Sequence, residues 1–194
     1  MPKVVPQYKE EAKERIIQAA LEIYSEKGPN QVTMDDVAKK LGVSKGALYL
    51  YFKSKDEILN EVIKATEQSV RKFLLSLLET NDLSKRLDDV FNNDMNEPNR
   101  QRRSLIFDFI AEGARNPETH KAVSEAYQQN LNALTDFLAN KDKQKTEKSR
   151  YQAVSLLALY LGIRASSILG VQSDDLRQAW QQSTKAILAD RGNK

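Results

Sequence analysis

Apolar residues recur every three or four positions along most of the chain, which is the spacing of one face of an α-helix. No stretch shows the strict alternation of apolar and polar residues that marks a β-strand. The pattern therefore predicts an all-α fold of about nine helices. The predicted helices cover residues 10–27, 34–41, 45–52, 54–80, 83–91, 100–115, 117–139, 147–170 and 173–190.

The stretch from residue 33 to residue 55 contains two short helical patterns separated by a tight turn. Thr33 precedes the first pattern and Asp36 follows three residues later, which resembles a capping box. Gly42 follows the first pattern, where many helices end in a left-handed residue, and Ser44 offers the N-cap of the second. Two helices joined by such a turn fit a helix-turn-helix motif, whose second helix enters the major groove of DNA.

An ordinary helical corner is the alternative interpretation of this stretch, and two features weigh against it. Residues 27–55 carry six lysines against Asp35 and Asp36, whereas the formal net charge of the whole chain is only +3. Gly46 removes a side chain from the first turn of the second helix, which costs about 1 kcal/mol of helix propensity. Such a glycine indicates close approach of the backbone to a partner.

The run TMDDVAKKLGVSKGALYLYFKSKDEIL, which begins at Thr33, resembles the DNA-binding signature of the TetR family of one-component transcriptional regulators. The resemblance covers residues 10–70, with the motif at residues 33–52, whereas residues 71–194 agree only in length and helical character. It implies an N-terminal three-helix helix-turn-helix head, joined by a long helix to a C-terminal helical body that binds a ligand and dimerises. It also implies a repressor that binds a palindromic double-stranded DNA operator as a homodimer. A small hydrophobic or amphipathic effector, for example an acyl-CoA, would release it.

The predicted DNA contacts divide by their chemistry. Lysines and the first amides of a helix bind phosphates well, and such contacts add affinity rather than sequence choice. The family pattern assigns this role to Thr33, Tyr49 and Lys55. Residues on the second helix are candidates to reach base edges, although Tyr51 could instead pack within the head. These candidates are Ser44, Lys45, Gly46, Ala47, Leu50 and Tyr51.

A stripe of small residues predicts a close helix contact near the C-terminus. Its members recur every four residues and are Ala158, Gly162, Ser166 and Gly170. The last helix offers Trp180 and Ile187 as a complementary ridge. The resemblance implies that these two helices form half of a four-helix dimer interface, and a contact within one chain is the alternative.

The middle helices are expected to enclose a ligand cavity. Its candidate lining residues are Phe73, Phe107, Tyr127, Tyr160 and Arg164, although aromatic residues at helical spacing also suit an ordinary core. Arg164 could pair with a buried acid or meet an anionic ligand head. The cluster of Arg100, Arg102 and Arg103 is interpreted as a solvated helix start, with binding of a phosphate as the alternative.

Composition narrows the remaining classes of function. The chain has no Cys, so it has no disulfide framework and no Cys-ligated metal site, and we expect no metal or cofactor. Its N-terminus lacks an apolar signal core, and its longest strongly apolar run is too short to cross a bilayer, so we expect a cytoplasmic protein with no membrane partner. No catalytic motif is present, so an enzyme is not expected. Two alternatives stay open: a helical small-molecule-binding protein or enzyme without DNA binding, and an RNA-binding or architectural protein.

Overall fold

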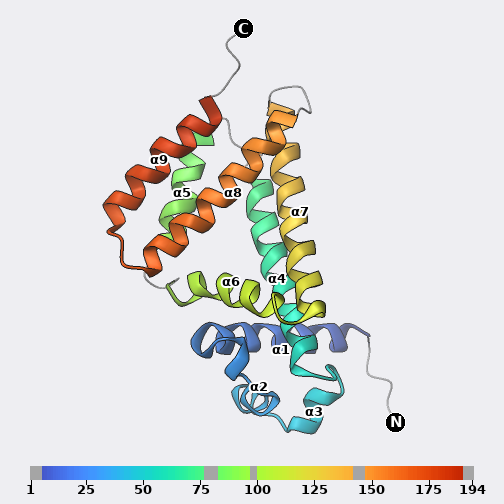
Figure 1. The fold of residues 1–194 in the computed structure, drawn as a ribbon. Coiled ribbons are helices and arrows are strands. Elements are labelled where there is room, and N and C mark those ends of the chain that lie inside the picture. Colours follow the sequence, from blue (N-terminus) through green and yellow to red (C-terminus); the bar gives the residue numbers. More distant parts are fainter. Residues whose placement is uncertain (1–5, 77–82, 97–99, 142–146, 190–194) are drawn as a thin grey trace. The chain divides into compact units, whose positions relative to one another are not determined.

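The computed structural model describes residues 6–76, 83–96, 100–141 and 147–189. Every regular element in these ranges is a helix, which confirms the all-α prediction (Figure 1). In chain order the elements are α1 (Pro6–Lys27), the 3-10 helix η1 (Pro29–Gln31), α2 (Met34–Leu41), α3 (Lys45–Tyr49), α4 (Lys55–Ser76), α5 (Leu83–Met95), α6 (Arg100–Gly113), α7 (Pro117–Lys141), α8 (Glu147–Ile168) and α9 (Ser173–Ala189).

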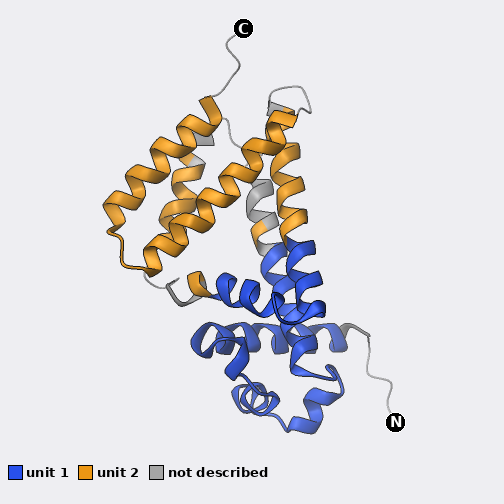
Figure 2. Ribbon diagram, in the orientation of Figure 1, with its two compact units in different colours: residues 1–68, 105–126 blue, residues 69–104, 127–194 orange. Residues whose placement is uncertain are grey.

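The chain divides into two compact units, shown in different colours in Figure 2. Unit 1 comprises residues 1–68 and 105–126, and unit 2 comprises residues 69–104 and 127–194. The predicted head ended at residue 70, and unit 1 adds a segment of α6 and α7 to it. The reason is packing: Leu105, Phe109 and Ala122 are buried in the same apolar core as the helix-turn-helix.

The core of unit 1 holds the short helices in place. Ile16, Ala20 and Ile23 form the inner stripe of α1, as their spacing predicts. Leu48 and Phe52 anchor α3 and the turn that follows it, and both are almost completely buried. Because α3 has only five residues, these two side chains, rather than helix propensity, fix its orientation.

The core of unit 2 is built around Trp180 of α9. Its ring lies 6.2 Å from that of Phe91 and 6.3 Å from that of Tyr160, and its indole N–H donates to the carbonyl of Leu87 over 3.0 Å. Helices α5 and α8 thereby both lie against α9 (Figure 1). Trp180 is only 3% exposed within its own chain, so its assignment to a dimer interface is wrong.

Helices α3 and α5 end at other residues than predicted. α3 ends at Tyr49 rather than Phe52, and the amides of Tyr51 and Phe52 both donate to the carbonyl of Leu48. α5 continues to Met95, four residues beyond its predicted end, through a polar stretch that resembles a loop. Residues 77–80 of the predicted long helix lie outside the described part of the chain. None of the described helices combines the length and the apolar character needed to cross a membrane.

Gly170 does not belong to the α8 stripe, contrary to its prediction as an interface residue on that helix. α8 ends at Ile168, and Gly170 adopts a left-handed φ of 90°. The amide of Gly170 donates to the carbonyl of Ser167, and the amide of Val171 donates to that of Ser166. This pair of hydrogen bonds is a Schellman motif, so the glycine terminates the helix.

Candidate nucleic-acid interface

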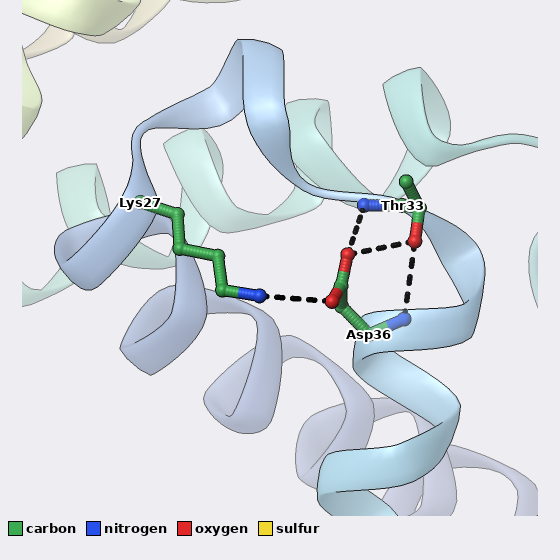
Figure 3. Close-up of polar contacts among 3 residues, drawn as sticks. All are labelled: Lys27, Thr33 and Asp36. Atoms are coloured by element: carbon green, nitrogen blue, oxygen red, sulfur yellow. Dashed lines mark hydrogen bonds and ion pairs between the residues drawn. The ribbon is translucent and has the colours of Figure 1, made fainter.

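A capping box fixes the start of α2. The Thr33 hydroxyl oxygen accepts from the amide of Asp36 over 3.2 Å, and the amide and hydroxyl of Thr33 donate to Asp36 Oδ2 over 2.9 and 2.7 Å. Lys27 Nζ donates to the other carboxylate oxygen over 2.9 Å (Figure 3). The Thr33 hydroxyl, followed by Lys27, holds the pKa of the Asp36 carboxyl well below its usual range. Thr33 therefore caps the helix, and its contact with a phosphate stays a prediction.

A Schellman turn sets the angle between α2 and α3. Gly42 has a φ of 67° and donates to the carbonyl of Lys39 over 3.1 Å, and Val43 donates to that of Ala38 over 3.0 Å. Ser44 then caps α3, because its hydroxyl accepts from the amide of Ala47 over 3.2 Å. The left-handed glycine at position 42 and the N-cap at Ser44 were both predicted from the sequence, and both are present in the structure.

The outer face of α3 is open to solvent. Lys45 and Gly46 are exposed at its start, and Tyr49 and Leu50 are 49% and 76% exposed at its end. Ala47 and Tyr51 are half-buried, and Tyr51 packs against the core of unit 1. The exposed Leu50 side chain gives this face apolar contact area beside the cation of Lys45.

Lys45 is held in position by α2. Its ammonium forms an ion pair with Asp35 over 2.9 Å, and both side chains are about half exposed at 47% and 55%. The hydrogen bond from this ammonium to Asp35 raises the pKa of Lys45, so the side chain is charged at neutral pH. An exposed pair of this kind contributes little to stability and can exchange readily for another anion.

The start of α4 lies beside this face. Ser54 accepts from the amide of Glu57 over 3.1 Å, and Glu57 reaches back to the amide of Lys53 over 2.6 Å, one residue beyond the usual capping box. The buried Tyr24 hydroxyl donates to the carbonyl of Lys55 over 3.2 Å, and burial raises the pKa of that hydroxyl. The side chain of Lys55 stays exposed. Lys45, Tyr49 and Lys55 are therefore all exposed. Side chains that contact DNA must be accessible in this way.

Comparison with known proteins identifies this arrangement. Residues 16–62, which contain α2, the turn and α3, match the family described as bacterial regulatory proteins, tetR family. A segment of 58 residues is 41% identical to the HTH-type transcriptional regulator SrpR of Pseudomonas putida, over 30% of this chain and 27% of SrpR. This segment therefore belongs to the TetR family of bacterial regulatory proteins. Members of this family are transcriptional regulators, which confirms the expectation that the protein is not an enzyme.

Two further comparisons cover most of the chain at lower sequence identity. The HTH-type transcriptional regulator UidR of Escherichia coli K12 is 22% identical over 181 residues, which are 90% of this chain and 89% of UidR. Salmonella enterica GusR has the same fold, with a TM-score of 0.74 and 21% identity over 97% of this chain and 100% of its own. SrpR, by contrast, is matched over only 27% of its length. The higher identity is therefore found over a short segment, and the longer match has the lower identity.

The structure brings together two of the five predicted ligand residues. The Arg164 guanidinium lies over the Tyr160 ring, 5.0 Å from its centroid. Phe107 is half-buried in unit 1, Tyr127 is exposed in unit 2, and the side chain of Phe73 lies outside the described part of the structure.

Two charged residues of this region, Asp94 and Arg103, were missed by the sequence analysis. Asp94 accepts from Nε and Nη2 of Arg164, each over 2.9 Å, and is the buried acid that Arg164 was expected to find. Arg103, interpreted as part of a solvated helix start, is instead 4% exposed. The side chains of Arg100 and Arg102 lie outside the described residues. Asp94 falls in a polar stretch typical of a loop, so no sequence signal marked it.

Three of the six predicted interface residues, Ala158, Gly162 and Ser166, lie on α8. Ala158 and Gly162 are exposed, and Ser166 is half-buried. A Cβ added to Gly162 would meet no atom within 4 Å, so the space above this residue is open in the single chain. Ile187 of α9 is half-buried against the core of unit 2.

Proposed function

We propose that this TetR-family protein is a cytoplasmic transcriptional repressor that binds a palindromic DNA operator as a homodimer and is released by a small-molecule effector. The main support for this proposal is the exposure of the outer face of α3. Leu48 is buried and fixes the helix, while Lys45, Tyr49 and Leu50 project into solvent. A short helix anchored on one side and open on the other is what entry into a major groove requires.

The contacts are divided by what each side chain can do. Lys55 and Tyr49 bind phosphates, and Thr33 holds the start of α2 in place for contacts of its first-turn amides. Ser44, Gly46 and Ala47 lie where the backbone comes closest to the base edges. Their small side chains permit that approach. Lys45 donates to guanine after leaving Asp35, and Leu50 contacts a thymine methyl group. Tyr51 contributes by supporting the face from within, since it packs against the core.

A gel-shift assay with the DNA upstream of its own gene tests the DNA-binding assignment. The double variant Tyr49→Ala, Lys55→Ala should bind this DNA with much lower affinity than the wild type. Lys55→Ala alone should lower the slope of log K against log salt by about 0.9 for each phosphate that the lysine no longer neutralises. Lys121→Ala is the matched control, because Lys121 is an exposed lysine of the same unit on α7. Undiminished binding by the double variant would refute the assignment.

The dimer is proposed to form through the outer face of α8. Helical spacing places Tyr151, Ser155, Ala158 and Gly162 on one face, and all four are exposed. Small residues at its centre let a partner helix approach closely, and Tyr151 supplies apolar area at one end. Trp180 has no part in this interface, since its own chain buries it. Two copies related by a two-fold axis would present their α3 helices to successive major grooves, roughly 34–36 Å apart.

Sedimentation equilibrium tests the interface with a pair of matched variants. Ala158→Arg places a long cation in the middle of the proposed contact and should yield a monomer. Ala111→Arg makes the same change at another exposed helical alanine, in α6, and should leave a dimer. A dimer of the Ala158→Arg variant would show that α8 does not form the interface.

The effector is proposed to be small and hydrophobic or amphipathic, for example an acyl-CoA, and to bind in the helical body. It shifts the protein away from the DNA-binding state only to the extent that it binds the other state more tightly. The half-buried pair of Tyr160 and Arg164 supports a polar point of attachment in unit 2.

A further inference from the structure

Unit 2 contains a cluster of polar and charged side chains, of which two are buried and two half-buried. We define the buried arginine cluster as Asp94, Arg103, Tyr160 and Arg164. These residues come from the end of α5, the start of α6 and the middle of α8. Arg103 and Asp94 are 4% and 8% exposed, so water solvates neither charge to any large extent.

The hydrogen bonds of this cluster leave Arg103 without a counter-ion. The carboxylate of Asp94 is occupied by Arg164, through Nε and Nη2 at 2.9 Å each. Arg103 Nη1 has only backbone acceptors, the carbonyls of Asp94 at 2.7 Å and of Asn96 at 3.1 Å. No carboxylate in the described part of the chain forms an ion pair with Arg103. The cluster therefore holds two guanidinium groups and one carboxylate, and that carboxylate pairs with Arg164.

One side of the Arg103 guanidinium is also without a hydrogen bond. Its Nε is buried and has no acceptor among the residues that the structure describes. Capping the C-terminal end of α5 accounts for Nη1, because cations near a helix end bind its last carbonyls. It does not account for Nε. A buried unpaired N–H on a buried charge is costly, and an acceptor that carries a negative charge offsets that cost most effectively.

We propose that Arg103 binds the anionic group, a carboxylate or a phosphate, of the effector. An arginine fork matches the two oxygens of either group, which a lysine does not. The inference rests on the proposed function, and it names the chemical class of the molecule that releases the protein from DNA. α6 carries Arg103 in unit 2 and Leu105 in the core of unit 1, so a ligand held by Arg103 acts on a helix that also belongs to the DNA-binding unit.

Trp180 provides the readout, because it is the single tryptophan of the chain and its ring lies 6.3 Å from Tyr160 of the cluster. The probes are octanoate, octyl phosphate and neutral octanol, which share the alkyl chain and differ in the head group. The full-length protein is titrated with each, and Trp180 emission is recorded. A carboxylate ligand is indicated by tighter binding of octanoate, and a phosphate ligand by tighter binding of octyl phosphate. Both anions should bind better than octanol.

Three variants separate a ligand contact from a structural role. Arg103→Gln should weaken binding of the preferred anion by about tenfold or more, the usual effect of losing a hydrogen bond to a charged group. Arg103→Lys keeps the charge and loses Nε, so it should show a smaller but measurable loss, and it decides the matter if Arg103→Gln does not fold. Arg177→Gln is the control, since Arg177 lies 5.1 Å over the Phe91 ring but outside the cluster, and its binding should not change.

Equal affinity for octanol and both anions would overturn the proposal, as would wild-type protein that binds no anion. Binding by a folded Arg103 variant that equals the wild type would do so as well. Gel shifts of the ligand-free protein test DNA binding separately, so a failure of the anion assignment can be told from a failure of the proposed function.

Discussion

Removing the carboxylate of Asp94 should destabilise unit 2 strongly. Asp94→Ala leaves the Arg164 guanidinium, whose side chain is only 14% exposed, without its counter-ion. Loss of one partner from a buried ion pair typically costs about 3–5 kcal/mol. Arg164 keeps the face of Tyr160 at 5.0 Å, so we expect a value near the lower end, about 3 kcal/mol. Arg164→Ala should cost a similar amount, because the Asp94 side chain is 11% exposed.

The double variant should reveal the coupling. Once both charges are gone, neither is left buried and unpaired, so the double variant should lose less stability than the sum of the two single variants. The difference should be about 2 kcal/mol, within the range found for residues in direct contact. Urea denaturation at neutral pH followed by Trp180 fluorescence measures all three variants, since the only tryptophan lies in unit 2.

An exposed contact of the same unit serves as the control. Gln181 of α9 donates to Asp88 of α5 over 3.1 Å at the surface, and Gln181→Ala should change the free energy of unfolding by less than about 0.5 kcal/mol. The reasoning fails if Asp94→Ala and Arg164→Ala each cost less than about 1 kcal/mol and add without coupling. That result would place the pair among ordinary surface ion pairs.

Three further predictions concern unit 1 and its helix ends. Gly42→Ala should cost about 1 kcal/mol because its φ of 67° disfavours a Cβ, and an unchanged urea midpoint by circular dichroism would contradict this. Asn116→Ala should cost about 1 kcal/mol, because its side chain caps the amides of Glu118 and Thr119 at 3.0 and 3.3 Å; a neutral result in the same assay would refute the cap. The carboxyl of Asp36 has a lowered pKa when folded, so its contribution is complete above pH about 4 and is lost as the pH falls through that lowered value. The stability advantage of the wild type over Asp36→Asn should therefore shrink in acid, and an advantage that is equal in acid and at neutral pH would exclude this role.

The helix-turn-helix could be predicted because its determinants are local. The cap of α2 joins residues three positions apart, and the Schellman turn at Gly42 joins residues three and five apart. Each signal depends on backbone geometry that a few neighbouring residues fix by themselves. α7 begins at residue 117 as predicted, and its cap is local too, because the Asn116 side chain accepts from amides within three residues of it.

The body could not be predicted to the same depth because its contacts join distant segments. Arg164 and Asp94 are 70 positions apart, and Trp180 and Leu87 are 93 apart. Helical periodicity shows that α9 has an apolar face, but it cannot distinguish a face that packs on its own chain from one that meets a partner. Trp180 was misassigned for that reason. The spacing of small residues continued to Gly170, but the helix had already ended there.

In the short helix α3, the residues needed for folding differ from the residues available to contact DNA. Folding depends on its inner residue Leu48 and on Phe52 just beyond it, whereas Lys45, Gly46, Tyr49 and Leu50 are exposed. Mutations at those outer positions can therefore accumulate at little cost to stability. A gene copy could acquire a new operator sequence by substituting a handful of surface residues while the scaffold beneath them stayed unchanged.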